Sequence, residues 1–177
     1  DLNKRMKWFE NYRRNNQKYL PNEETKDGKR LLLSLVNKEK LIAILERVFD
    51  ENEFLSEYGI RSLSKVYKDH PYTVALDGET YTVQYDPANS TSGMFGGNSN
   101  WRGPIWLPIN YLFIKSLHTY YDFYGEDIKI EFPKGSGNYQ NLQEAACGLT
   151  HRLLSIFLKN EKRDRPVFGA YSGFYKN

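Results

Sequence analysis

Two tryptophans and an arginine lie close together where a glycine-rich loop passes into an apolar segment, in the stretch GGNSNWRGPIWLPINYL at residues 96–112. Trp101 and Trp106 offer flat indole faces, which can stack on the CH faces of a sugar ring. Between them, Arg102 offers five N–H donors in a fixed fork. Apolar faces combined with directed donors suit a polyhydroxylated ligand, and this stretch is therefore a candidate saccharide site.

Neighbouring polar residues extend the candidate site. The amides of Asn98 and Asn110 both donate and accept hydrogen bonds, as sugar hydroxyls do. A second polar and aromatic turn, EYGIRSLS, contributes Tyr58, Arg61 and Ser62, which we expect to line the same cleft. The alternative for both stretches is structural: the indoles fill the core at a helix start while Arg102 pairs with an acid, and the serines of the second turn cap a helix.

Two carboxylates are weak candidates for catalysis. Glu57 and Asp86 stand in loop-forming sequence, from which either could project into a cleft. Paired carboxylates are the usual equipment for glycoside cleavage. The alternatives for each residue are a helix cap or an ion pair with a nearby arginine.

Other kinds of site are disfavoured. The three histidines, His70, His118 and His151, are far apart in the sequence and lack metal-binding spacing, so we expect no metal site. Cys147 lies in the helical stretch LQEAACGLT and is expected to be a small buried thiol. Neither a G-x-S-x-G motif nor a P-loop is present, and no cofactor is expected.

Composition and charge limit the partners. The net charge of +3, from 25 basic and 22 acidic residues spread over 177 positions, is too small to indicate a nucleic-acid partner. No apolar run reaches the roughly 18 residues typical of a membrane span, so no membrane partner is expected. A single cysteine cannot form an internal disulfide, and a reduced cytoplasm is the expected location.

Apolar periodicity and turn residues predict a mainly helical chain with long loops. Helices are expected over residues 3–20, 30–50, 108–125 and 141–159. Asn37 is also a plausible cap that would divide the second of these segments. Asp77-Gly78 lies between alternating β-rich runs and predicts a hairpin. The loop at 86–107 collects glycine, tryptophan and arginine, which places the candidate site at helix ends.

The stretch GGNSNWRGPIWLPINYL resembles the signature loop and helix of glycoside hydrolase family 63, the processing α-glucosidase family with its bacterial and fungal relatives. Further stretches agree in the expected order over nearly the whole chain: MKWF, RLLLSLVNKEKL, DENEFLSEYGIRSLSKVYKDHPY, YDPANSTSGMFGGNSNWRG and RPVFGAYSGFY. The resemblance implies an (α/α)6 barrel, in which inter-helix loops build the active site at one end. We therefore expect a mainly α fold, as part of that barrel, with a small β-hairpin and long inter-helix loops.

The resemblance also implies an inverting hydrolase acting on α-glucosides or related α-linked saccharides. In such a mechanism one carboxylic acid protonates the glycosidic oxygen and a carboxylate about 6.5–9.5 Å away activates water. In the family the acid lies upstream of these motifs and the base is a glutamate downstream of the Pro-Val-Phe-Gly stretch. The general acid is thus expected before residue 1 and the general base after residue 177, and neither is assigned here.

The positions that carry over from the family are those of a saccharide-contacting surface, with Glu57 in a supporting role. They are Trp101, Arg102 and Trp106, then Tyr58, Arg61, Asn98 and Asn110. Because residues 1–177 contain fewer helices than the barrel needs, they are expected to be a single partial domain, inactive alone. Its expected partners are an oligosaccharide or small glycoside and the rest of its own catalytic domain.

Two other hypotheses stand beside the hydrolase. In one, the protein kept the barrel and lost the chemistry, and it serves as a carbohydrate-binding or assembly protein. In the other, it is a helical interaction domain whose aromatic residues are core. Both saccharide hypotheses place at least one indole on a concave surface, whereas the interaction domain buries both indoles with no adjacent cavity.

Overall fold

The computed structural model describes residues 1–16, 22–25, 28–97 and 101–175. Its α-helices are α1 (Leu2–Asn15), α2 (Lys38–Val48), α3 (Leu107–Tyr124) and α4 (Leu142–Ser155). Short 3-10 segments lie at Lys65–Lys68, Met94–Gly97, Gly125–Asp127 and Pro166–Tyr175. The prediction of a mainly helical fold is confirmed, whereas the (α/α)6 ring stays a prediction.

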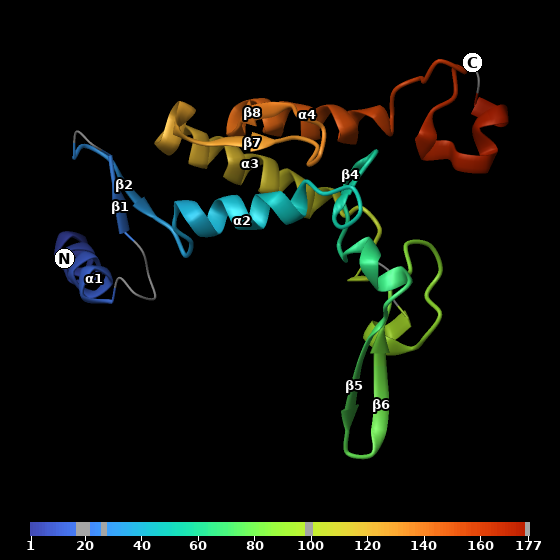
Figure 1. The fold of residues 1–177 in the computed structure, drawn as a ribbon, viewed down its shortest axis with the longest axis horizontal. Coiled ribbons are helices and arrows are strands. Elements are labelled where there is room, and N and C mark those ends of the chain that lie inside the picture. Colours follow the sequence, from blue (N-terminus) through green and yellow to red (C-terminus); the bar gives the residue numbers. More distant parts are fainter. Residues whose placement is uncertain (17–21, 26–27, 98–100, 176–177) are drawn as a thin grey trace.

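The strands of the described residues form separate antiparallel pairs. These are β1 (Asn22–Glu24) with β2 (Leu31–Leu33), β3 (Leu55–Ser56) with β4 (Gly59–Ile60), β5 (Tyr72–Leu76) with β6 (Glu79–Val83), and β7 (Lys129–Glu131) with β8 (Tyr139–Asn141). Figure 1 shows that β5 and β6 project away from the helices, whereas β7 and β8 lie along α4.

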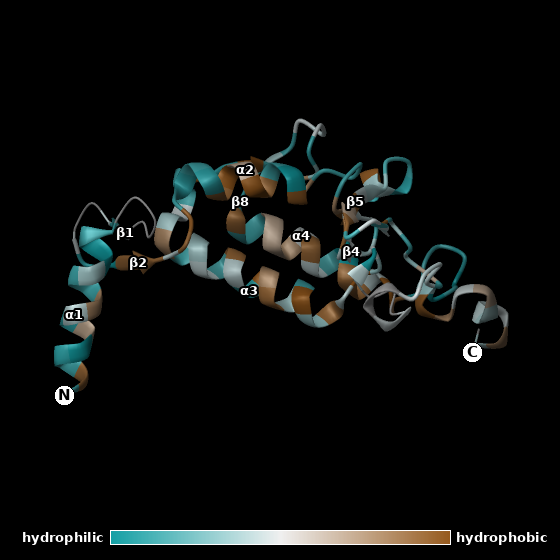
Figure 2. Cartoon of the chain, turned by 90° about the horizontal axis from the view of Figure 1, so that it is seen from below, coloured by the Kyte–Doolittle hydropathy of each residue, from teal (hydrophilic) through white to brown (hydrophobic). Residues whose placement is uncertain are grey.

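The core lies between α2, α3, α4 and the β7–β8 pair, which are side by side in both views of the chain (Figures 1 and 2). Its centre is Phe49, which is fully buried and meets the ring of Phe132 edge to face at a centroid distance of 4.8 Å. The other buried apolar residues are Leu41, Leu45, Leu55, Leu117, Ile128, Ile130, Leu142, Ala145, Ala146 and Leu149. Burial of these side chains holds the three helices together. This packing fixes the position of α3, whose N-terminal end lies at the candidate site.

Local signals set the helix ends. The Asn37 side chain accepts a hydrogen bond from the Lys40 N–H at 3.1 Å, so α2 begins at Lys38. Helix α3 has Pro108 in its first turn and ends before Gly125, which has a φ of 55°. The cap at Asn37 and the helix expected over 108–125 are confirmed, the latter with a start one residue earlier.

The expected helix over 30–50 is wrong in its first part. Residues Leu31–Leu33 form β2, which pairs with β1, and the helix starts only after the cap at Asn37. Three consecutive leucines fit either a strand or a buried helix turn, and pairing with another strand decided the outcome. The hairpin is confirmed: Asp77 and Gly78 form its two-residue turn, with φ of 52° and 82°.

Cys147 was expected to be buried and is exposed. The residues of α4 that face the core are Leu142, Ala145, Ala146 and Leu149. Cys147 follows Ala146 and falls on the outer face, because successive helical residues are turned by about 100°. Among the described helices, none is long and apolar enough to cross a membrane.

Candidate functional site

The candidate saccharide site lies at the N-terminal end of α3, where two loops meet. A hollow of about 220 Å³ is lined by Ile60, Arg61, Ser62, Trp101, Trp106, Ile109 and Asn110, and we call it the indole hollow. Trp101 is 49% exposed and Trp106 is half-buried. Their rings meet edge to face, with centroids 4.8 Å apart and planes at 80°. The hollow beside the two indoles disagrees with the interaction-domain hypothesis, which predicted no adjacent cavity.

Arg102 points into the protein, although it stands next to Trp101 in the sequence. Its side chain is fully buried; one guanidinium nitrogen lies 3.5 Å from Asp86 Oδ2 and donates to Ser90 Oγ at 2.6 Å. Arg102 does not line the indole hollow. The guanidinium of Arg102 therefore has the acidic partner that the structural alternative predicted, whereas Trp101 and Trp106 line the hollow.

Asp86 is buried and surrounded by donors. Its Oδ2 accepts a hydrogen bond from the Thr91 hydroxyl at 2.7 Å, and its Oδ1 accepts one from the Gln84 amide at 3.2 Å. The Thr91 hydroxyl, followed by Gln84 and the Arg102 charge, lowers the pKa of the Asp86 carboxyl below its usual value, against the opposing effect of burial. Asp86 is thus a buried carboxylate with protein partners on both oxygens.

Asn110 joins α3 to the turn at β4. Its Oδ1 accepts from the Ile60 N–H at 2.7 Å, and its Nδ2 donates to the Ile60 carbonyl at 2.9 Å and to the Trp106 carbonyl at 3.1 Å. The side-chain amide therefore acts as a strand partner for Ile60. Asn110 also lines the indole hollow, and its side-chain amide is hydrogen-bonded to the backbone of Ile60 and Trp106.

Glycine permits the close approach of the two loops. Gly103 has a φ of +130°, and a Cβ placed on it would lie 2.3 Å from the ring of Tyr85. Its N–H donates to Ser62 Oγ at 2.9 Å, and the Ser62 N–H donates to the Pro104 carbonyl at 3.1 Å. An isolated bridge between Arg61 and Ile105 continues this contact. The loop carrying the indoles is thus bound directly to the turn that follows β4.

Arg61 borders two hollows. Its guanidinium donates to the Leu55 carbonyl, and its side chain lines both the indole hollow and a neighbouring one of about 450 Å³. Glu57 is exposed and lines the neighbouring hollow only. Tyr58 is half-buried and lines neither; burial and the charge of Glu57 raise its pKa.

Of the seven predicted contact residues, the structure brings four to the indole hollow: Trp101, Trp106, Arg61 and Asn110. Tyr58 and Arg102 lie outside it, and Asn98 is outside the described residues. Ser62 was also expected at this cleft from the EYGIRSLS turn, and it lines the hollow. Ile60 and Ile109 line the hollow too, but the sequence analysis did not single them out. Ile60 lies in the same EYGIRSLS turn, so its position was a signal, whereas Ile109 is one apolar residue among several in a helical stretch.

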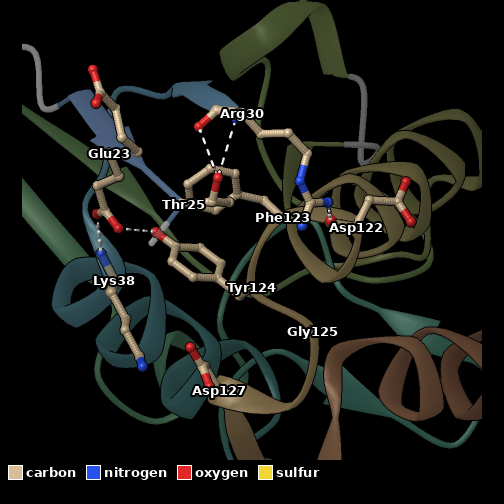
Figure 3. Close-up of a pocket in the computed structure, with 10 residues that line it drawn as sticks. Glu23, Thr25, Arg30, Lys38, Asp122, Phe123, Tyr124, Gly125 and Asp127 are labelled. Atoms are coloured by element: carbon tan, nitrogen blue, oxygen red, sulfur yellow. Dashed lines mark hydrogen bonds between the residues drawn. The ribbon is translucent and has the colours of Figure 1, made fainter. Parts of the chain in front are cut away.

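A further hollow, of about 500 Å³, lies at the other end of α3 and is lined by Glu23, Glu24, Thr25, Arg30, Lys38, Asp122, Phe123, Tyr124, Gly125 and Asp127. Figure 3 shows that several of its polar groups bond to one another. Tyr124 Oη donates to Glu23 Oε2 at 2.8 Å, and Glu23 Oε1 accepts from the Lys38 N–H at 3.0 Å. None of the predicted site residues lines this hollow. Within the described part of the chain, no group of His, Cys, Asp and Glu side chains has the arrangement of a metal site.

Comparisons with known proteins find two fungal relatives, one over nearly the whole chain and one over less than half of it. An uncharacterized protein of Saccharomyces cerevisiae is 48% identical over 174 residues, which are 97% of this chain and 16% of the yeast protein. A protein of Schizosaccharomyces pombe named as a probable mannosyl-oligosaccharide glucosidase is 36% identical over 83 residues, 46% of this chain and 7% of that protein. The chain thus spans a small part of the length of these relatives. No solved structure matches it.

The family model for the glycosyl hydrolase family 63 C-terminal domain matches residues 29–147. This segment is more than half of the chain, and it contains both loops of the indole hollow, all of α3 and the start of α4. The resemblance seen in the Trp-Arg-Gly-Pro-Ile-Trp stretch is confirmed, and the chain belongs to glycosyl hydrolase family 63.

Proposed function

We propose that this chain supplies saccharide-contacting loops to an inverting glycoside hydrolase that acts on α-glucosides or related α-linked saccharides. In this proposal its helices are part of an (α/α)6 barrel, and the indole hollow is one wall of the active-site cleft. The observation that carries the proposal is the corner formed by Trp101 and Trp106 beside an open hollow, in a chain of this family.

The lining of the hollow suits one face of a sugar ring. Trp101 presents a half-exposed indole, while Ile60 and Ile109 add apolar wall. An indole gives large rigid contact area at low conformational cost, and it matches the CH face of a pyranose. The volume of about 220 Å³ is below the roughly 300–1,000 Å³ of sites that enclose a whole small molecule. The hollow therefore fits a single sugar unit of a longer substrate.

Neither carboxylate of the described site is assigned to the chemical step. Asp86 is bonded to protein groups on both oxygens, and Glu57 lies on the neighbouring hollow. In this proposal the general acid and general base come from parts of the catalytic domain outside residues 1–177. The role of this chain is to bind and orient the substrate, which lowers the barrier by placing the scissile bond between the two carboxylates.

Replacement of Trp101 tests the stacking role. In the full-length protein, Trp101→Ala should lower kcat/KM on α-linked glucose disaccharides about tenfold or more, because covering a large apolar side chain is worth about 1.5–3 kcal/mol and a factor of ten corresponds to about 1.4 kcal/mol. Trp8→Ala is the matched control, since Trp8 is also an exposed tryptophan but lies on α1, away from the hollow. Equal kinetic constants for the Trp101 variant and the wild type would refute the proposal.

The stereochemistry of the product tests the mechanism. An inverting enzyme releases the β-anomer of glucose first from an α-glucoside, and proton NMR distinguishes the two anomers before they equilibrate. Initial appearance of the α-anomer would contradict inversion. Saccharide binding by the full-length protein without any turnover would favour the alternative of a catalytically inert carbohydrate-binding protein.

A further inference from the structure

A polar cluster with two buried members adjoins the loop that carries Trp101. It consists of Asp86 and Arg102, both buried, with Gln84, Ser90 and Thr91. The proposed function does not use this cluster, because none of its members lines the hollow. Arg102 is nevertheless bonded in the chain to Trp101 on one side and to Gly103 on the other.

Asp86 holds the backbone of Arg102 as well as its side chain. The Asp86 N–H donates to the Arg102 carbonyl at 2.6 Å, while Asp86 Oδ2 lies 3.5 Å from the guanidinium. The Thr91 hydroxyl donates to the same Oδ2, and the Gln84 amide donates to Oδ1, so both carboxylate oxygens are held. The residue after Trp101 is therefore held at two points by one aspartate.

The other end of the indole pair is held independently. Trp106 precedes α3, and its carbonyl accepts from the Asn110 side chain at 3.1 Å, which also binds both backbone groups of Ile60. Trp106 is thus fixed by the helix and β4. Trp101 is half-exposed, so its own side-chain packing gives less constraint than its attachment to Arg102.

We propose that Asp86 is a positioning residue for the indole hollow: through Arg102 it sets the backbone that carries Trp101, and hence the angle between the two indoles. The proposal rests on the proposed function only for its kinetic consequence. An isolated charge at either position would be strongly unfavourable in this buried place, so each partner requires the other. A single guanidinium nitrogen of Arg102 contacts both Asp86 Oδ2 and Ser90 Oγ, so the side chain is tied to the loop at two residues.

The angle between the indoles can be measured without a substrate. Two indoles at 4.8 Å and 80° should give an exciton couplet in far-ultraviolet circular dichroism, which Trp101→Phe assigns by abolishing it. In the full-length protein, Asp86→Asn should reduce this couplet and raise KM for an α-linked glucose disaccharide about tenfold, with a smaller change in kcat. Asp50→Asn is the control, because it removes a carboxylate paired to Lys134 at 3.1 Å in another part of the chain.

Asp86→Asn leaves the buried Arg102 charge without its carboxylate, which can prevent folding. The double variant Asp86→Asn/Arg102→Gln removes both charges, and it should fold with the same reduced couplet. A wild-type couplet in a folded Asp86→Asn or double variant would overturn the positioning role, whatever the protein binds. A reduced couplet with unchanged KM would support the positioning role and refute the saccharide function of the hollow.

Discussion

Substitution of Gly103 by alanine tests whether the loop that carries the indoles is held as closely as the structure shows. A Cβ at this position would lie 2.3 and 2.4 Å from two carbons of the Tyr85 ring, well inside the carbon contact distance of about 3.5–4.0 Å. The φ of +130° is also a backbone conformation that residues other than glycine rarely adopt. Two separate costs therefore act at one residue.

The two costs can be estimated separately. Backbone strain of this kind costs about 1–3 kcal/mol, and overpacking of a filled site costs about 1–3 kcal/mol more. We expect Gly103→Ala to lower the free energy of unfolding by about 2–6 kcal/mol in total. Because the displaced loop carries Trp101, the indole couplet and saccharide affinity should fall with it.

Two other glycines separate the contributions. Gly78 has a φ of +82° and open space around it, so Gly78→Ala measures the backbone cost alone. Gly148 lies in α4, where a Cβ would be 2.6 Å from the Phe132 ring. Gly148→Ala thus measures overlap alone, offset by alanine's gain of about 1 kcal/mol in helix propensity.

Urea unfolding of the three variants, with tryptophan fluorescence as the probe, gives the comparison. Gly103→Ala should be less stable than either control. In a Tyr85→Ala background the overlap should disappear, and the cost of Gly103→Ala should fall to that of Gly78→Ala. If Gly103→Ala costs no more than Gly78→Ala in the wild-type background, the Tyr85 ring moves freely and the reasoning is refuted.

Three further predictions concern α2 and the buried carboxylate. Leu45→Ala should cost about 2–5 kcal/mol of unfolding free energy in urea, because Leu45 is buried in the core; Ile44→Ala, at an exposed position on the same helix, should cost under 1 kcal/mol or so. Asn37→Ala removes the α2 cap and should lower the free energy of unfolding by about 1 kcal/mol. Asn37→Ser should retain most of this stabilisation, because serine is also a good cap. Asp86 has a lowered pKa in the folded protein, so its stabilisation is present above its unfolded pKa of about 3.9 and is lost as the pH falls through the lower folded value. Acid titrations of stability should therefore be shallower below about pH 4 in Asp86→Asn than in the wild type, and parallel curves would contradict this.

Local sequence signals predicted those parts of the fold that depend on a few neighbouring residues. Asn37 caps α2 through a bond to Lys40, and Asp77-Gly78 turns the hairpin by its own backbone preference. The start of α2 and the hairpin were therefore predictable. The strand at Leu31–Leu33 depends on pairing with β1, and this contact has no local signature.

The candidate site was predictable in its residue types and less so in their directions. Trp101 and Trp106 were recognised from stacking chemistry, and the structure places both on a hollow. The direction of Arg102 depends on Asp86 and Ser90, earlier in the same long loop. Such a loop has no periodicity from which to read an inward or outward face. Ile109 shows the same limit, because an apolar residue in the first turn of a helix suits a core or a ligand cleft equally.

Attachment of the Asn110 side chain to Ile60 couples the opening turn of α3 to a segment fifty positions earlier in the chain. Trp106 and Ile109 belong to one side of this connection, and Ile60 and Arg61 belong to the other. Any rigid displacement of α3 therefore carries both sides along together. The indole hollow would therefore move together with α3 and keep its shape. Small shifts of the surrounding helices would then leave the fit between the hollow and a substrate unchanged.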